Sequence, residues 1–321
     1  MEQMSVIGCG RWGTFLAWYV ANYCDIKKVL LYGMVGAPTY DELKQYRKNE
    51  YLTLSDNMEM TSDLTQTLTS DFIIISINCQ NLRGLAKQLN GYDLNGKTFL
   101  LAMKGLEEPS AKILAQVFRE EINQDIHIAT LGGPGHVEDY LKGVPSAAVI
   151  DSFEPETQDR VIRFMQSNLI RFYYGTDLIG NQVGAALKNV IGLAAGILDG
   201  LGWWGLKGAL MARAPIEVGR LIEFLGGKRE SVYGLAHLGD YEATLFSRNS
   251  HNRMFGEMFA KGEAYNRTAE GVDTLRAVKA IADREHIEMP ICQALYSIIF
   301  EQADIKATIR GLFDRSLKKE F

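Results

Sequence analysis

The first 150 residues alternate short apolar runs with longer amphipathic ones, which is typical of repeated strand–helix–strand units. A helix is expected over Thr14–Tyr23, and strands are expected over Met4–Ile7, Lys28–Tyr32, Phe72–Ile77, Thr98–Met103, His127–Thr130 and Ala147–Ile150. Nearly continuous apolar runs such as Phe72–Ile77 are characteristic of strands that are covered on both faces. The pattern therefore predicts an α/β fold, with a doubly wound, Rossmann-type parallel sheet and helices on both of its sides.

After Thr176 the pattern changes to a helical one with almost no strand signal. Gly180–Leu201 is rich in alanine and glycine, with Val, Leu and Ile at regular spacing, and predicts a buried central helix that neighbouring helices approach closely. Further helices are expected over Glu217–Leu225, Glu270–His286 and Ile291–Ile305. We therefore expect a dinucleotide-binding domain over 1–175 and an all-α substrate and catalytic domain over 176–321. The chain has no low-complexity linker near the boundary, so the two domains should pack tightly.

Length and composition agree with two globular domains. The chain has 321 residues, 47% of them hydrophobic and 23% charged, and a net charge of −5. The negative balance excludes a general nucleic-acid-binding surface. Four widely spaced cysteines without a C-x-x-C pair, and no clustered histidines, argue against disulfide scaffolding and metal sites. We find no signal peptide and no apolar run long enough to span a bilayer, so we expect a cytoplasmic protein without membrane insertion.

A glycine-rich turn follows the first expected strand. The segment from Gly8 to Gly13 reads Gly-Cys-Gly-Arg-Trp-Gly and fits the G-x-G-x-x-G pattern between a strand and a helix. In such a turn the first glycine permits the tight bend, the second lets the backbone approach a pyrophosphate, and the third allows close helix–strand packing. The helix N-terminus then faces the anion. The alternative is a structural glycine turn, but the placement favours a dinucleotide site formed by Gly8, Gly10, Arg11, Trp12 and Gly13.

The end of the second expected strand bears on the choice of cofactor. A carboxylate there favours NAD and an arginine favours NADP, but the segment Leu31–Val35 offers neither. We expect NAD or NADP and favour NAD slightly, because Met34 gives a 2′-phosphate no partner.

Two lysines stand out from their surroundings. Lys188 lies in the middle of an otherwise apolar helix, where a desolvated ammonium can donate or accept a proton. The competing interpretation is a surface lysine whose stem lies along the helix. Lys104 follows the expected strand Thr98–Met103, and ligands of open α/β sheets bind outside the carboxyl ends of strands. A lysine in that position is otherwise simply solvated.

Taken together, these segments resemble the NAD(P)-dependent glycerol-3-phosphate dehydrogenase family in its bacterial form. The resemblance runs from Gly8 to about Pro290 and rests on several blocks in a fixed order. These are Gly8–Thr14, Met103–Glu107, Gly132–Pro134, Asn181–Gly202, Leu238–Asp240, Asn252–Gly256 and Ala269–Gly271. The resemblance implies a Rossmann domain, a helical domain and a cleft between them, in which dihydroxyacetone phosphate and sn-glycerol 3-phosphate are interconverted by hydride transfer. It also implies a homodimer.

The resemblance assigns roles to particular residues of this chain. Lys188 matches the catalytic lysine that protonates the ketone oxygen, and Lys104 matches a lysine at the Rossmann edge of the active site, close to cofactor and substrate. Asp240 and Thr244 match a polar network around the substrate oxygens, and Asp240 is otherwise a turn or cap aspartate. The remaining matched positions are Gly133 beside the substrate, Asn252 at the phosphate and Glu270 on the cofactor side.

Several positions depart from the family pattern where the substrate is expected. His251 stands in place of the phosphate-binding arginine, which histidine replaces poorly. Arg248 lies three residues earlier and, if the segment is helical, would share a face with His251 and supply the missing charge. Gly135 replaces a small hydroxyl residue, His136 an aromatic one and Asn78 a proline.

The resemblance and these departures from it support three functional hypotheses. The first is a dehydrogenase that acts on a small, anionic, phosphorylated substrate, namely glycerol 3-phosphate. The second is a related dehydrogenase that acts on a different phosphorylated or acidic hydroxy compound. The third is a non-catalytic dinucleotide sensor, which the presence of Lys104, Lys188, Asp240 and Thr244 together disfavours.

Overall fold

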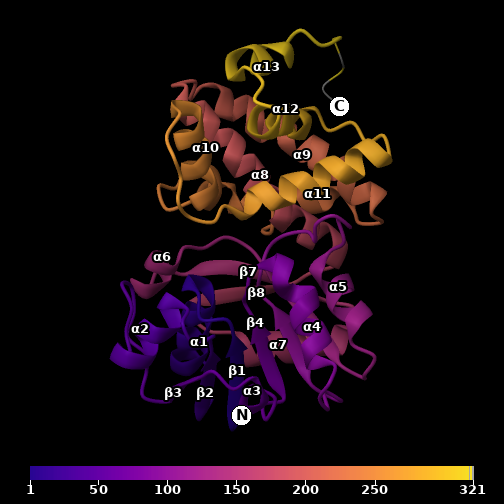
Figure 1. Ribbon diagram of the computed structural model, residues 1–321. Coiled ribbons are helices and arrows are strands. Elements are labelled where there is room, and N and C mark those ends of the chain that lie inside the picture. The colour runs from indigo at the N-terminus through magenta and orange to yellow at the C-terminus, as the bar shows by residue number, and fades with distance from the viewer. Residues whose placement is uncertain (318, 320–321) are drawn as a thin grey trace.

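A computed structural model describes residues 1–317 and 319, and its N-terminal part is built on an eight-stranded sheet (Figure 1). The strand order across the sheet is β3-β2-β1-β4-β5-β6-β7-β8. The strands are β1 (Gln3–Ile7), β2 (Lys28–Tyr32), β3 (Met58–Thr61), β4 (Phe72–Ile75), β5 (Thr98–Leu101), β6 (His127–Gly132), β7 (Ser146–Ser152) and β8 (Ile170–Tyr174). The chain order reverses between β1 and β4, and this switch point is where open α/β sheets bind their ligands.

The sheet confirms the predicted fold class but is not wholly parallel. β1 pairs in parallel with both β2 and β4, whereas β7 runs antiparallel to β6, with Leu131 opposite Ile150. The prediction of a fully parallel sheet was therefore wrong at this one pair, because apolar periodicity carries no information on strand direction. β3 and β8, which the apolar pattern did not reveal, form the two edges of the sheet.

Both faces of the sheet are covered, as the apolar strands require. Ile73 and Ile75 of β4 pack into one apolar cluster with α4 and α5, while Phe72 and Ile74 pack into another with α1 and α7. The helices of this half are α1 (Arg11–Tyr23), α2 (Pro38–Tyr46), α3 (Leu64–Thr67), α4 (Leu82–Leu89), α5 (Leu114–Glu121), α6 (Val137–Leu141) and α7 (Pro155–Met165), with a 3₁₀ turn η1 at Cys79–Asn81. The doubly wound arrangement is thus confirmed.

The second half of the described chain is helical. Its α-helices are α8 (Leu178–Gly200), α9 (Leu206–Phe224), α10 (His251–Lys261), α11 (Glu270–Arg284), α12 (Pro290–Phe300) and α13 (Ile305–Gly311). Between α9 and α10 lie the 3₁₀ turns η2 (Arg229–Tyr233) and η3 (Leu238–Asp240) and the π-helical turn η4 (Glu242–Phe246). The segment Ile291–Ile305, expected as one helix, is divided between α12 and α13, because the chain leaves helical conformation at Glu301 and bends at Gln302, whose φ is +57°.

α8 is the central helix of this domain, and its glycines set how closely α10 approaches. A Cβ atom on Gly196 would lie 2.0 Å from the Arg253 carbonyl oxygen, and one on Gly256 of α10 would lie 2.1 Å from the Leu193 carbonyl oxygen. Any side chain at either position would therefore push the two helices apart. The expectation that no apolar segment is long enough to cross a bilayer was wrong for α8, which is long and apolar enough by length and composition. Most of this helix is buried inside the helical domain.

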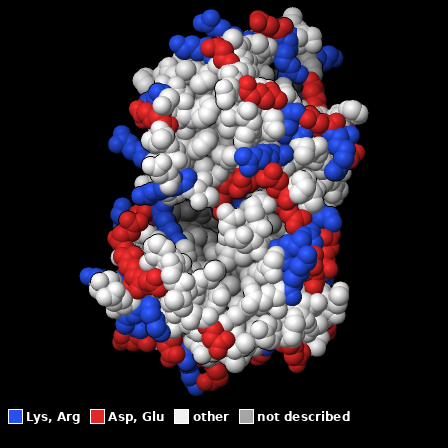
Figure 2. Space-filling model, viewed as in Figure 1, with Lys and Arg blue, Asp and Glu red and all other residues white. Residues whose placement is uncertain are grey.

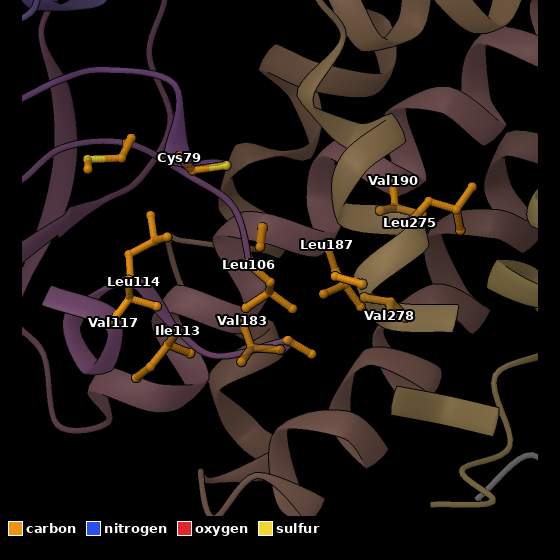
Figure 3. Close-up of a cluster of buried hydrophobic side chains, with 14 of the residues drawn as sticks. Cys79, Leu106, Ile113, Leu114, Val117, Val183, Leu187, Val190, Leu275 and Val278 are labelled. Atoms are coloured by element: carbon orange, nitrogen blue, oxygen red, sulfur yellow. The ribbon is translucent and has the colours of Figure 1, made fainter. Parts of the chain in front are cut away.

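One apolar core joins the two halves (Figure 3). Val183, Leu187 and Val190 of α8 lie between Leu106 and Ile113 of the Rossmann half and the α11 helix of the other half. The last strand ends at Tyr174 and α8 begins at Leu178, so the expected division at 175/176 falls in the short connection between them. Because apolar burial is the main favourable term in folding, this shared core holds the two halves in a fixed relation.

Candidate active site

The glycine-rich turn has the geometry that a dinucleotide needs. Gly8 has a φ of +112°, and a Cβ there would lie 2.1 Å from the Ser76 carbonyl oxygen of the loop after β4. A Cβ on Gly13 would lie 1.9 Å from the Gly8 carbonyl oxygen, so this glycine is needed for α1 to pack on the turn. A Cβ on Gly10, in contrast, would meet nothing within 4 Å. The middle glycine thus opens onto free space, where a pyrophosphate can approach the backbone.

The N-terminus of α1 faces the same space. α1 begins at Arg11, directly after Gly10, and no side chain caps its first turn. The positive end of the helix dipole and the free N–H groups there form a site suited to a phosphate group. Arg11 turns toward α6, where its Nη2 donates to a carboxylate oxygen of Glu138. The geometry of this turn fits a bound NAD or NADP.

The segment that directly follows β2, residues 33–37, contains no charged side chain. Tyr32 ends the strand, and Met34 and Val35, which follow, are 68% and 73% exposed. Tertiary structure nevertheless brings carboxylates near this edge, because Asp41 Oδ1 accepts from the Gly36 N–H at 3.3 Å and the charge of Asp63 acts on Tyr32. The slight preference for NAD stays a prediction.

Three charged side chains from different elements meet at the carboxyl edge of the sheet. Asp240, at the end of η3, accepts a hydrogen bond from Lys104 Nζ at 2.6 Å and lies 2.9 Å from Lys188 Nζ, both through Oδ2. The Asp240 side chain is 1% exposed, that of Lys188 10% and that of Lys104 22%. Lys188 is therefore a buried, paired lysine and not a solvated surface residue. Its Nζ also donates to Thr244 Oγ1 at 2.7 Å, and Lys104 Nζ donates to the Gly133 carbonyl oxygen at 3.0 Å.

The environment of Lys188 suits proton transfer near neutral pH. Burial lowers the pKa of Lys188 to about 8, helped by the nearby Lys104 charge and opposed by Asp240. An ammonium with this pKa remains mostly protonated at pH 7 but loses its proton readily. Glu270, the first residue of α11, lies close to both lysines, and burial raises its pKa to about 7 against their attraction.

A second buried network fixes η3 against α8. His237 Nδ1 donates to the Gly184 carbonyl oxygen of α8 at 2.8 Å, and His237 Nε2 lies 2.8 Å from the Tyr241 hydroxyl, which donates to it. Burial lowers the pKa of His237 to about 4, so the ring is neutral and can hold both bonds. Because His237 and Tyr241 flank Asp240, this network sets the position of its carboxylate relative to Lys188.

The loop after β6 forms the wall of the site on the Rossmann side. Gly133 has a φ of +132°, and its carbonyl oxygen holds Lys104. Gly135 has a φ of +149°, and a Cβ there would lie 2.2 Å from the Tyr140 hydroxyl oxygen, which explains why this position carries no side chain. His136 follows, and its Nε2 is buried without a hydrogen-bond partner among residues 1–317 and 319.

The expected phosphate position lies at the start of α10. Ser250 caps this helix by accepting from the Arg253 backbone N–H, and α10 then begins with His251 and Asn252. His251 is half-buried, with Nδ1 2.5 Å from the Tyr265 hydroxyl oxygen, and Asn252 Oδ1 accepts from the Gly271 backbone N–H at 2.9 Å. Arg248 lies in an exposed turn before the helix, so it does not share a helical face with His251. Arg248 was expected to replace the missing arginine only if it shared a helical face with His251, and it does not.

Arg253, the arginine within α10, already has carboxylate partners. Its Nη1 contacts Asp199 and Glu257, each at 2.8 Å, and its Nε donates to the Ser247 carbonyl oxygen. Lys207 joins the same cluster, 2.6 Å from Asp199. Arg253 therefore serves to hold α10 against α8.

These groups lie between the two domains. Figure 2 shows a hollow at this level of the molecule, with both basic and acidic side chains at its rim. Among residues 1–317 and 319, no cluster of His, Cys, Asp and Glu could hold a metal ion, and the four cysteines are free. The paired Lys104, Asp240 and Lys188 side chains offer acid–base chemistry and positive charge for an anion.

Some residues of this region gave no signal in the sequence. Tyr265 and Arg267 lie in a short polar segment between α10 and α11 that has ordinary loop composition, and His237 and Tyr241 look like unremarkable loop residues. Their proximity to His251 and Asp240 comes from tertiary packing, which apolar periodicity does not reveal.

Comparisons with known proteins agree with this geometry. Residues 3–158 match the family model for the NAD-dependent glycerol-3-phosphate dehydrogenase N-terminus, and residues 177–310 match that for its C-terminus. The chain is 33% identical to a glycerol-3-phosphate dehydrogenase [NAD(P)+] of Clostridium botulinum, covering 100% of this chain and 99% of the relative. It is 31% identical to one of Pelodictyon phaeoclathratiforme, covering 99% of each.

A solved structure shows the same architecture. The crystal structure of glycerol-3-phosphate dehydrogenase from Coxiella burnetii superposes with a TM-score of 0.90 at 26% identity, covering 98% of this chain and 99% of that one. The match includes both halves of the molecule and therefore the cleft between them. Together with the family models, it shows that the chain belongs to the NAD-dependent glycerol-3-phosphate dehydrogenase family.

Proposed function

We propose that this chain interconverts dihydroxyacetone phosphate and sn-glycerol 3-phosphate by hydride transfer with NAD or NADP. The observation that carries the proposal is the buried Lys188–Asp240–Lys104 cluster, which lies at the carboxyl edge of the sheet beside the glycine cradle. The relatives at 31% and 33% identity bear the name of this activity.

The residues that would hold the cofactor follow from the cradle. Gly8, Gly10 and Gly13 admit the pyrophosphate, with Arg11 and Trp12 beside it at the start of α1. When bound, the nicotinamide supplies hydride to the ketone or accepts it from the alcohol. Lys104 and Glu270 lie toward the reacting end of this site. Because its pKa is about 7, Glu270 is partly protonated at neutral pH and can hydrogen-bond a neutral carboxamide.

Lys188 is the general acid and base in this proposal. Reduction of a ketone places negative charge on its oxygen, and the Lys188 ammonium donates the proton that neutralises it. In the oxidation direction the neutral amine takes the proton from the alcohol. A pKa of about 8 makes both forms available near neutral pH, and burial of the group strengthens its interaction with the developing charge.

The remaining residues position the lysine and the substrate. Asp240 keeps the Lys188 ammonium oriented, and Thr244 accepts one of its N–H groups. Lys104 adds a second positive charge, and the Gly133 carbonyl oxygen holds it in place. On the opposite side, Asn252 and His251 begin α10 where the substrate phosphate is expected.

One observation favours a second candidate, a dehydrogenase with a different phosphorylated or acidic substrate. His251 is not a fixed cation, because burial and the charge of Arg267 lower its pKa. The test is steady-state oxidation of NADH and NADPH with dihydroxyacetone phosphate beside related phosphorylated and carboxylated ketones. Turnover of another ketone with none of dihydroxyacetone phosphate would replace the first candidate with the second.

A direct test of the mechanism is Lys188→Ala. We expect this variant to lose at least about 10²-fold in kcat, because general acid catalysis contributes about that much or more. NADH binding, followed by nucleotide fluorescence, should change little because Lys188 lies outside the glycine cradle. Near-normal turnover would refute the role of Lys188, and loss of NADH binding would instead indicate a structural role.

We further propose that the enzyme works in the cytoplasm as a homodimer. Free cysteines suit a reducing compartment, and the family resemblance supports the dimer. Light scattering coupled to size-exclusion chromatography measures the assembly directly.

A further inference from the structure

Among the residues that the structure describes, α10 offers no free fixed positive charge at the phosphate end of the site. His251 occupies the first position of α10, but its ring is neutral near pH 7 because burial and two neighbouring arginines, Arg267 and Arg11, lower its pKa, while Glu138 opposes them. Arg253 is held by Asp199 and Glu257, and Arg11 is paired with Glu138. A phosphorylated substrate nevertheless needs a charge-assisted donor for tight binding.

The segment before α11 passes directly over this position. Tyr265 contacts His251, with its hydroxyl oxygen 2.5 Å from Nδ1, and Gly271 donates its backbone N–H to Asn252 Oδ1 at 2.9 Å. The segment is therefore bonded to each of the first two residues of α10, through Tyr265 to His251 and through Gly271 to Asn252. Arg267 lies between the two attachment points, two residues after Tyr265. An extended chain covers about 3.3–3.6 Å per residue, so its backbone cannot lie far from His251.

The positive charge of Arg267 acts on both residues of the His251–Tyr265 contact. Its positive charge lowers the pKa of His251 and opposes the rise that burial causes in the pKa of the Tyr265 hydroxyl. Arg267 is exposed, and it has no ion pair or hydrogen bond with any residue of 1–317 or 319. The Tyr265–His251 contact thus brings the Arg267 backbone near His251, and no described residue engages its guanidinium, whereas Asp199 and Glu257 engage that of Arg253.

We propose that Arg267 supplies the fixed charge that binds the substrate's phosphate group, with His251 as a neutral hydrogen-bond donor beside it. This inference rests on the proposed function. In the proposed arrangement the Tyr265 hydroxyl is the donor to His251 Nδ1, so that the ring proton lies on Nε2 and is donated to a phosphate oxygen. The forked guanidinium of Arg267 can take two further oxygens. The phosphate-binding cation thus lies on the segment before α11 and not on α10.

The experiment compares Arg267→Gln with the wild-type enzyme on two ketones, dihydroxyacetone phosphate and the unphosphorylated dihydroxyacetone. We expect the ratio of the two kcat/KM values to fall about 10- to 100-fold, the size of one lost charge-assisted hydrogen-bonding group. Arg284→Gln, which removes an exposed positive charge from the far end of α11, is the matched control and should leave the ratio unchanged. Both substituted side chains are exposed, so folding should be preserved.

A second variant tests whether a positive charge at another position can replace that of Arg267. Adding His251→Arg to Arg267→Gln places a guanidinium at the first position of α10, and we expect it to restore a large part of the ratio. A ratio within twofold of wild type in Arg267→Gln would overturn the proposal, as would a comparable fall in Arg248→Gln with Arg267→Gln unaffected.

Binding of inorganic phosphate separates this proposal from the proposed function. With NADH bound, isothermal titration should show phosphate binding to the wild type that weakens about 10-fold or more in Arg267→Gln. That result supports a phosphate site at Arg267 even if the wild type does not turn over dihydroxyacetone phosphate, in which case only the proposed reaction fails. Equal phosphate affinity in the two proteins refutes the role of Arg267 whatever the enzyme's substrate is.

Discussion

Replacing Asp240 by asparagine removes a charge from the centre of the site while nearly preserving the side-chain shape. Asp240 Oδ2 lies 2.6 Å from Lys104 Nζ and 2.9 Å from Lys188 Nζ, and the side chain is 1% exposed. In Asp240→Asn the buried Lys188 ammonium and the partly buried Lys104 ammonium lose their shared counter-ion. The protonated form of Lys188 then loses its main electrostatic support, and its pKa should fall further below about 8.

The size of this effect follows from the contact distance. Two unit charges about 3 Å apart attract by roughly 5 kcal/mol at an effective dielectric constant of about 20. The carboxylate charge is spread over two oxygens and shared with Lys104, so we take about half of this value for Lys188. Since one pKa unit corresponds to about 1.4 kcal/mol, the pKa of Lys188 should fall by roughly two pH units.

The assay is the pH dependence of kcat/KM in both directions, followed through the absorbance of NADH. In the proposed mechanism ketone reduction needs protonated Lys188, so the wild-type rate should fall as pH rises through about 8, and alcohol oxidation should rise over the same range. In Asp240→Asn both transitions should move to lower pH. Asp273→Asn is the control, because Asp273 pairs with Arg276 and contacts neither lysine.

An Asp240→Asn profile that coincides with the wild-type profile would show that Asp240 does not control the charge of Lys188. The variant must be shown to fold, because a buried pair that loses one partner typically costs about 3–5 kcal/mol of stability. Thr244→Val gives an independent check if Asp240→Asn does not fold. It removes only the 2.7 Å hydrogen bond from Lys188 Nζ and should shift the profile less and in the same direction.

Three further predictions concern stability and cofactor binding. His237 has a pKa of about 4 in the folded state against about 6.5 in the unfolded chain, so the free energy of unfolding should decrease by up to about 3 kcal/mol as pH falls from 6.5 to 4. Below pH 4 this group should cause no further change. Urea denaturation at several pH values should show a flatter pH dependence of the free energy of unfolding in His237→Gln, and an equal slope would contradict this pKa of His237. Gly10→Ala should fold with near-normal stability but bind NADH at least about 10-fold more weakly, because its Cβ enters open space at the pyrophosphate position. Gly13→Ala should instead be strongly destabilised, because its Cβ would lie 1.9 Å from the Gly8 carbonyl oxygen, and thermal unfolding separates the two outcomes.

The fold was predictable where burial of a segment requires a recognisable pattern of apolar residues. The central strand β4 is apolar at every position because helices cover both faces, and apolar periodicity finds such strands readily. Apolar periodicity did not identify the two edge strands. In β3, Glu59 points to solvent, and in β8 Arg171, Tyr173 and Tyr174 are exposed, so neither strand forms a continuous apolar run. The reversed direction of β7 is a property of the connection and leaves no trace in its composition.

The site was predictable only in part, for a related reason. Lys188 attracts notice because it interrupts an apolar helix, but the sequence pattern around it does not identify Asp240 as its partner. That pairing came from the family resemblance, and the structure shows the contact. Arg267 had neither kind of signal, because a charged residue in an exposed segment is ordinary and its neighbour His251 is distant in sequence.

The way the two domains are joined explains why the charged cluster can be held ready for the reaction. Lys188 sits on α8, the helix whose Val183 and Leu187 pack against the Rossmann half through Leu106 (Figure 3). Its partner Asp240 comes from the helical half, and Lys104, which shares the same Asp240 oxygen, comes from the loop after β5. Separating the domains would therefore expose apolar surface and break the Lys104–Asp240 ion pair at the same time. The ion pair and the apolar core favour the same relative placement of the domains, so the electrostatic environment of Lys188 is fixed before substrate arrives, which is the condition under which a preorganised charge lowers a reaction barrier most.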